Sequence, residues 1–284
     1  MTPVRLFLLT ALTMTAFAAN SVLNRMALAD WGMDAARFGT IRLWAGAVTL
    51  VALSYALRGG MRWGGRGRAL GVISLLIYIY GFSAAYLSLD AGLGALILFG
   101  FVQITMFGGA LRGGERPPAR RWAGAALAFA GLAWLLWPGS GAEVSLPHGI
   151  MMAAAGLGWG LYSLAGRGAG DPLVGTAANF ALAAPLGLII GVAFGDGGNL
   201  SGAGVALAIL SGAVTSGLGY ALWYSILPRL AASAAAVAQL TVPIIALGGG
   251  MIFLGESASL HFALASLLVL GGVAVSVLPF PKRG

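Results

Sequence analysis

Polar side chains inside long apolar segments are the residues of this chain that could do chemistry. Asn20 and Asn24 lie about one helical turn apart, where their amides could hold a ligand or bond a neighbouring helix. Arg42 lies about two turns inside the next apolar segment, so its guanidinium could bind a substrate carboxylate. The same arginine could instead reach the membrane surface or pair with Asp30 or Asp34.

Aromatic residues form the second set of candidates. Tyr78, Phe82 and Tyr86 follow one another at intervals of four and therefore share one helix face. Other candidates lie in the middle of later apolar segments: Phe99, Phe101, Gln103, Trp159, Tyr162, Tyr220 and Trp223. An aromatic cavity with a few amides favours planar or apolar ligands. Tyr and Trp near segment ends are also typical of the belt at the membrane surface.

The stretch "AQLTVPIIALGGG" adds Gln239, Thr241 and Pro243 to the candidates. Proline inside a helix removes one backbone hydrogen bond and frees the carbonyl of Gln239. A freed carbonyl in a membrane needs another partner or a wet cavity. We therefore predict a hinge at Pro243, with Gln239 and Thr241 as substrate contacts beside it.

The missing residue types limit the mechanism. Asp and Glu are absent from the depth of every apolar segment, which removes the proton-carrying carboxylate expected of many antiporters. We therefore favour facilitated diffusion, although Glu115 and Glu256 at segment ends leave a proton route open. The chain has no cysteine, and His148 and His261 stand far apart, so we expect no metal and no cofactor. Without a nucleophile beside a base, an enzyme is not expected either.

The composition shows what must position these side chains. With 59% hydrophobic residues, 8% charged residues and a mean hydropathy of +0.92, the chain has the composition of a polytopic membrane protein. A bilayer-spanning helix needs roughly 20 apolar residues. Ten segments qualify, near residues 5–25, 35–57, 69–89, 92–111, 120–138, 148–167, 172–194, 203–227, 232–254 and 259–279.

The distribution of arginines predicts the orientation. Most of the 16 basic residues fall in alternate short connections, which the positive-inside rule places in the cytoplasm together with both termini. We expect an integral protein of a bacterial-type inner membrane, with lipids as partners, no nucleic acid, and one chain as the working unit. The first 21 residues imitate a cleavable signal peptide, but their removal would spoil the repeat described next.

A glycine–glutamate pair follows an apolar segment at two places in the chain. Glu115 ends the fourth apolar segment and Glu256 the ninth, 141 residues apart in a chain of 284. This spacing predicts two halves of five spans, residues 1–141 and 142–284. Because five is odd, the second half enters the membrane in the opposite sense. Inverted repeats are characteristic of secondary transporters with a site near the midplane, and chance recurrence in an apolar chain is the alternative.

The stretches "GGERPPARRWAGAALAFAGLAWLL" and "LGESASLHFALASLLVLGGVAVSVL" resemble the ten-span EamA-type members of the drug/metabolite transporter superfamily. The tyrosine-rich third span and the small size resemble the YddG-type exporters of aromatic and other amino acids. The resemblance implies an all-helical fold with a central cavity and export of amino acids by alternating access. The alternative is export of nucleosides or drugs, with or without proton coupling. The family commonly has a proline late in both equivalent spans; Pro243 fits, but the fourth span has Val102 or Gln103 there.

Overall fold

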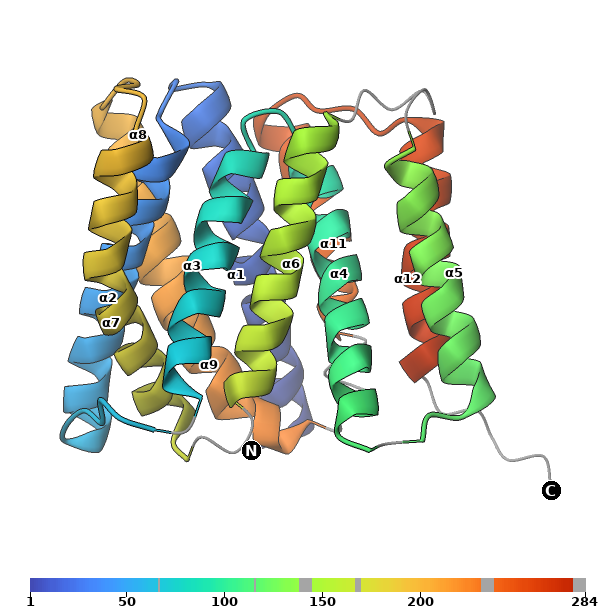
Figure 1. The fold of residues 1–284 in the computed structure, drawn as a ribbon, viewed down its shortest axis with the longest axis horizontal. Helices are drawn as coiled ribbons and strands as arrows, with labels where there is room; N and C mark the ends of the chain where they lie inside the picture. The colour runs from blue at the N-terminus through green and yellow to red at the C-terminus, as the bar shows by residue number, and fades with distance from the viewer. Residues whose placement is uncertain (66, 115, 138–144, 167–169, 231–237, 278–284) are drawn as a thin grey trace.

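The computed structural model describes residues 1–284 except 66, 115, 138–144, 167–169, 231–237 and 278–284. The described residues fold only into helices and their connections. Figure 1 shows them as an antiparallel bundle whose successive helices run up and down, because most of the connections between them are short. We call the face where α1 begins the lower face and the opposite one the upper face, as drawn in Figure 1.

Seven of the ten expected spans are helices long and apolar enough to cross a membrane. They are α1 (Pro3–Ala29), α2 (Ala35–Arg58), α3 (Arg68–Ala85), α4 (Ala91–Arg112), α6 (Leu146–Gly166), α7 (Pro172–Phe194) and the continuous helical run Gly202–Arg229. That run is composed of α8 (Gly202–Leu210), the π-helix η1 (Ser211–Leu218), α9 (Gly219–Ile226) and the short η2 (Leu227–Arg229). The other three expected spans contain shorter helices: α5 (Ala119–Leu135), α11 (Thr241–Phe253) and α12 (Leu260–Val277).

The structure places Pro243, the expected hinge of the ninth span, at a helix start rather than in a helix interior. A turn at Leu240 interrupts the helix, and α11 starts at Thr241, so Pro243 lies in the first turn of α11. Proline is tolerated there because the first N–H groups of a helix have no partner within the helix. The proline in the interior of a described helix is Pro185, in α7.

Glycines allow α6 to pack closely between α3 and α4. A side chain at Gly158 would meet the backbone of Ser74 and Tyr78 in α3, at 2.8 and 2.9 Å from its Cβ. A side chain at Gly156 would meet the Leu98 carbonyl of α4 at 2.6 Å. Trp159 follows these glycines toward the lower end of α6. The close approach of the two helices places its ring against Tyr78 of α3.

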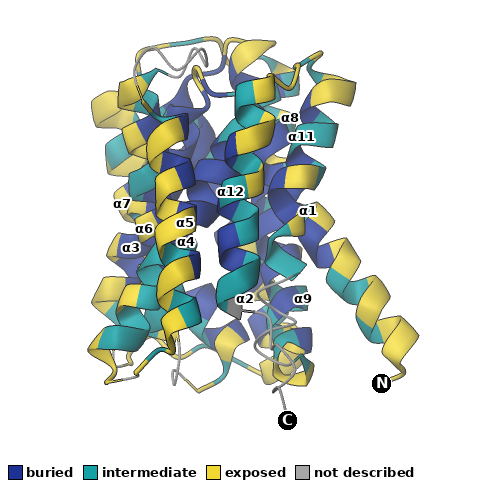
Figure 2. Cartoon of the chain, turned by 90° about the vertical axis from the view of Figure 1, so that its right-hand side faces the viewer, coloured by how far each residue is buried: buried dark blue, intermediate teal, exposed yellow. Residues whose placement is uncertain are grey.

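The buried residues lie on the helix faces that point into the bundle. The dark blue stripes of Figure 2 face inward and the yellow surfaces outward, while the lower part of α1 points away from its neighbours. Large apolar side chains such as Val192, Phe194 and Leu267 are more than two-thirds exposed on the outside. An apolar exterior around a partly polar interior is what a bilayer requires. α5 and α12 pair with each other at one side of the bundle and touch α4 (Figure 1).

Candidate functional site

Arg42 lies at the centre of the candidate site. Its side chain is fully buried on α2, where Nε donates to Ser216 Oγ at 3.1 Å and Nη2 donates to Tyr78 OH at 2.9 Å. The guanidinium also lies over the rings of Phe82 and Tyr78, 4.9 and 5.2 Å from their centroids. Both alternatives raised by the sequence are therefore wrong: Arg42 does not reach the surface, and Asp34 instead caps α2 by accepting from the Arg37 N–H.

The charge of Arg42 is not neutralised within the described residues. The ion pairs among the described residues involve Arg25 and Arg58, not Arg42. Arg42 itself contacts hydroxyl groups and aromatic faces. The Nη1 group is buried and has no hydrogen-bond partner. Guanidinium donates five hydrogens and cannot lose its charge in a protein. A buried cation of this kind is costly, and it favours binding of an anion at Nη1.

The π-helix η1 organises the polar residues around Arg42. Asn20 Oδ1, from α1, accepts from Ser211 Oγ at 2.8 Å and from Thr215 Oγ1 at 2.5 Å. Ser216 stands one position further along and accepts from Arg42. Such π-turns occur mostly as local insertions at functional sites. The sequence analysis did not select Ser211 and Thr215, because helical periodicity gives no sign of a π-helix.

Asn24 presents a second unsatisfied group in the same region. Its Nδ2 donates to Ser83 Oγ at 3.1 Å, which joins α1 to α3. Its Oδ1 is buried and accepts no hydrogen bond. The two asparagines therefore differ: Asn20 binds η1 through its oxygen, and Asn24 leaves its oxygen available for a donor.

Aromatic side chains surround these polar groups. Trp159 packs on Tyr220, Tyr78 and Phe17 with ring centroids 4.9, 5.0 and 6.4 Å apart. Trp223 is buried against Phe17 at 5.9 Å. Phe99 completes the lining of a central cavity of about 10 Å³, which holds about one water molecule. The expected central cavity is therefore closed to a substrate in this conformation.

Four of the sequence candidates are not among the buried residues of this cluster. Phe101 is half-buried and lies against Gly156 of α6, and Gln103 and Gln239 are half-buried. Thr241 is exposed and donates to the Ala238 carbonyl at 2.6 Å. The central cluster thus unites Asn20, Asn24, Arg42, Tyr78, Phe82, Phe99, Trp159, Tyr220 and Trp223.

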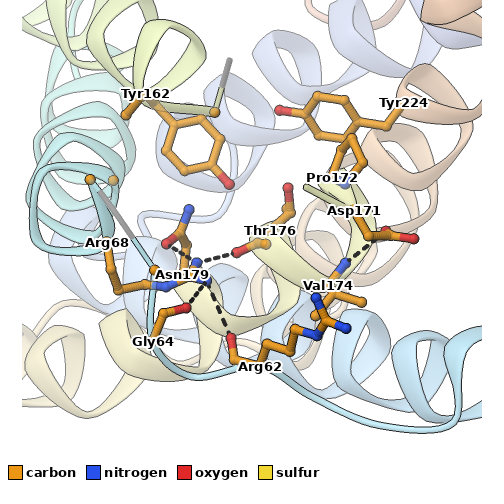
Figure 3. Close-up of a pocket in the computed structure, with 16 residues that line it drawn as sticks. Arg62, Gly64, Arg68, Tyr162, Asp171, Pro172, Val174, Thr176, Asn179 and Tyr224 are labelled. Carbon is orange, nitrogen blue, oxygen red and sulfur yellow. Dashed lines mark hydrogen bonds between the residues drawn. The ribbon is translucent and has the colours of Figure 1, made fainter. Parts of the chain in front are cut away.

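Tyr162 lines a larger pocket at the lower end of the bundle (Figure 3). The pocket has a volume of about 260 Å³ and lies between the α2–α3 connection, the start of α7, the end of α6 and α9. Tyr162 is stacked on Trp159, with centroids 5.5 Å apart and an angle of 18° between the rings. This stacked pair separates the lower pocket from the central cavity.

A network of charged groups closes the upper end; we call Arg25, Asp90 and Glu256 the upper network. The Glu256 carboxylate accepts from the Ala91 N–H at the start of α4, at 2.9 Å, and lies 3.9 Å from Arg25 Nε. Arg25 Nη2 lies 3.9 Å from Asp90, and Nη1 donates to the carbonyls of Tyr86 and Leu87. Burial raises the pKa of Glu256 to about 6, against the lowering effect of Ala91 N–H and Arg25. Glu115, the matching residue of the first half, lies outside the described residues.

The fold and this site define a polytopic helical membrane protein with a buried cation at its centre that has no acid partner among the described residues. Residues 147–278 match the EamA-like transporter family. The chain is 46% identical to the uncharacterized protein PA1977 of Pseudomonas aeruginosa, over 97% of this chain and 95% of that protein. A crystal structure of another protein shares the fold, with a TM-score of 0.64 and 19% identity over 93% of this chain and 96% of that one. The chain belongs to the EamA-like transporter family of the drug/metabolite transporter superfamily, whose members are membrane transporters of small metabolites.

Proposed function

We propose that this protein exports neutral amino acids, aromatic ones among them, through the site around Arg42. The observation that carries the proposal is the buried guanidinium whose Nη1 has no partner and whose charge has no counter-ion among the described residues. The carboxylate of an amino acid supplies both the missing acceptor and the missing charge.

The rest of the cluster suits the rest of an amino acid. The free Oδ1 of Asn24 accepts from an ammonium group, and the faces of Tyr78, Trp159 and Tyr220 attract a cation or stack on a planar side chain. These groups lie on α1, α3, α6 and α9, so opening of the central cavity requires these helices to separate.

The packing of helices supports two inverted halves, residues 1–141 and 142–284. When each span is exchanged for its counterpart in the other half, the most extensive contacts of the bundle are reproduced. α3 with α6 corresponds to α9 with α1, and α4 with α6 corresponds to α11 with α1. The pairs α2–α7, α4–α11 and α5–α12 each join a span to its own counterpart. Rocking of such halves against each other is the usual route to alternating access.

The arginines support a cytoplasmic lower face. Nine described arginines lie at that end, Arg5, Arg58, Arg62, Arg68, Arg112, Arg116, Arg120, Arg121 and Arg229, whereas Arg25 and Arg37 lie at the upper end. With the lower pocket hollow, the upper network closed and the Trp159–Tyr162 stack between that pocket and the centre, this conformation corresponds to an inward-facing occluded state of a bacterial-type inner-membrane exporter. Both termini are then cytoplasmic.

Uptake into proteoliposomes tests the function. Purified protein is reconstituted and exposed to a panel of labelled amino acids, nucleosides and cationic drugs, with and without a pH gradient. We expect saturable uptake of neutral amino acids that does not depend on the gradient, because the described apolar helices hold no Asp or Glu at depth. Uptake of nucleosides or drugs without amino acids would contradict the proposal, and gradient-driven uptake would contradict facilitated diffusion.

A further inference from the structure

The lower pocket presents hydrogen-bond donors in an arrangement that the central site does not explain. Figure 3 shows the side chains of Tyr162, Tyr224, Thr176 and Asn179 pointing into it from α6, α9 and α7. Arg62 stands at its mouth, in the connection between α2 and α3. The question is which chemical group this lining recognises.

Arg68 sets the orientation of Asn179. Arg68 Nη1 donates to Asn179 Oδ1 and to the Gly175 carbonyl, both at 2.6 Å. Its Nε and Nη2 donate to backbone carbonyls of the α2–α3 connection, at Trp63, Arg62 and Gly64. Because guanidinium can only donate, the oxygen of Asn179 must face Arg68 and its NH₂ group must face away. Figure 3 shows that NH₂ group directed toward Tyr162.

Tyr162 adds a buried donor without a partner. The side chain is 3% exposed, and its hydroxyl faces Thr176 and Asn179 without reaching hydrogen-bonding geometry with either. Tyr224 turns its hydroxyl toward the same space from the opposite wall. A buried hydroxyl left unsatisfied costs free energy, which a ligand with an acceptor atom would recover.

The charge of the lining favours an anion. Asp171 is the acid among the described lining residues, and its carboxylate already pairs with Arg58 and accepts from the N–H groups of Leu173 and Val174. Burial, the largest single effect, raises the pKa of Asp171, but these contacts together outweigh it and hold the pKa below its usual range. The carboxylate therefore stays ionised and its oxygens keep these partners. Arg62 and Arg68 thus leave the pocket with an excess of positive charge.

We propose that the lower pocket is a first binding subsite for the carboxylate of the transported metabolite, held by the Asn179 NH₂ group and the hydroxyls of Tyr162 and Tyr224. The inference rests on the proposed function, since it assumes a substrate with a carboxylate. It adds a second site below the Trp159–Tyr162 stack, separate from Arg42. The substrate binds here before the stack opens toward the centre.

A single cysteine in the pocket tests the proposal. The chain has no native cysteine, so Ala165→Cys, in the lining and half-exposed, gives one reactive thiol. The rate of its reaction with a maleimide is measured in detergent with L-phenylalanine, L-phenylalaninamide, inorganic phosphate or no addition. We expect phenylalanine to slow labelling at least about fivefold and the amide to have no effect, because only the former carries a carboxylate.

Variants separate the two sites. Asn179→Asp keeps an oxygen for Arg68 but replaces the NH₂ donor with a negative charge, and Tyr162→Phe removes the hydroxyl while keeping the stack. In each, the concentration of phenylalanine needed for protection should rise about tenfold. Tyr55→Phe, an exposed tyrosine of α2, and Arg42→Gln should leave protection unchanged.

The outcomes are distinct. Absence of protection by phenylalanine, protection by the amide, or protection by phosphate alone would overturn the carboxylate subsite. Loss of protection in Arg42→Gln would also overturn it, because the ligand would then occupy the centre. Protection that persists in a protein without any uptake of amino acids into liposomes would uphold the subsite and reject the proposed function.

Discussion

At the scale of single residues, Arg42 is central because it is a fully buried cation without an acid partner among the described residues. Its two partners have other bonds: Tyr78 OH lies 3.4 Å from Tyr220 OH, and Ser216 Oγ lies 3.5 Å from Asn20 Oδ1. Replacing a buried ion by an apolar side chain of similar volume is often neutral or stabilising. We therefore expect the positive charge of Arg42 to serve a ligand.

The first prediction separates function from stability at this residue. Arg42→Met should lower amino-acid uptake at least about tenfold, since a buried charge–charge contact is lost, while the melting temperature in detergent stays equal or rises. Both quantities are measured on the same preparation. A fall in the melting temperature parallel to the loss of uptake would show that Arg42 is structural.

The second residue-scale prediction concerns Glu256 and pH. Its pKa is raised from 4.5 to about 6 in the folded protein, so the folded state binds its proton more tightly than the unfolded state does. The stability contributed by this proton is complete below pH 4.5 and is lost as pH rises through about 6. The loss amounts to at most about 2 kcal/mol.

Glu256→Gln removes this titration. The difference in unfolding free energy between wild type and Glu256→Gln should therefore change between pH 4.5 and 7. It is measured by denaturant unfolding at several pH values. The contributions of Asp171 and the other acids are the same in both proteins and cancel in the difference. A difference independent of pH would mean that Glu256 titrates normally.

At the scale of elements, the close contact between η1 and α2 fixes the position of Arg42. A Cβ on Gly212 would overlap the carbonyl oxygen of Arg42 and lie 2.8 Å from the Ala45 side chain. The third prediction follows: Gly212→Ala should destabilise the protein by about 1–3 kcal/mol through overpacking. Gly248→Ala is the matched control, because its Cβ meets open space within α11 and should stabilise by about 0.5–1 kcal/mol. Equal effects of the two changes in thermal unfolding would contradict this packing.

The elements also show what the sequence could predict. Runs of about 20 apolar residues predicted seven long spans at nearly the observed positions, because hydropathy and length suffice for a helix in a bilayer. The helix break expected at Pro243 lies at the turn of Leu240 instead, which moves the proline to a helix start, and the hinge itself stays a prediction. The π-helix that places Ser216 against Arg42 was not predicted, since it depends on packing against α1 and α2 rather than on periodicity.

Some features of the candidate site could be predicted from the sequence, and others could not. Burial of Asn20, Asn24 and the stripe from Tyr78 to Phe82 was predictable, because polar groups and one-sided aromatic rows avoid lipid. For Arg42 the sequence left burial and the membrane surface as alternatives, and the structure shows it buried. Placement of Tyr162 in a separate pocket was not predictable, since one turn of α6 decides between Trp159 at the centre and Tyr162 below it. The free Nη1 of Arg42 and Oδ1 of Asn24 depend on three-dimensional contacts alone.

At the scale of the whole molecule, one end is hollow and the other is closed. The upper network joins α1 and the start of α4 to the α11–α12 connection. In an alternating-access cycle these contacts break when the upper end opens. The relative free energy of the two conformations therefore depends on Glu256.

The fourth prediction uses this dependence. Ser21→Cys places a single thiol on the lining of the central cavity. In this background, Glu256→Ala removes the partner of Arg25 and of the Ala91 N–H. The rate at which an impermeant reagent labels the thiol from the upper side should therefore rise by about tenfold. Ser201→Ala, a change in another upper connection, is the control. An unchanged labelling rate would mean that the upper network does not hold the closed conformation.

The central claim, that Arg42 binds the carboxylate of the substrate, is tested most directly by uptake of L-phenylalanine and L-phenylalaninamide into proteoliposomes containing wild type or Arg42→Gln. We predict that the wild type takes up the acid at least about tenfold faster than the amide, and that Arg42→Gln loses this preference while remaining folded. Equal uptake of acid and amide by the wild type, or an unchanged preference in Arg42→Gln, would contradict the account.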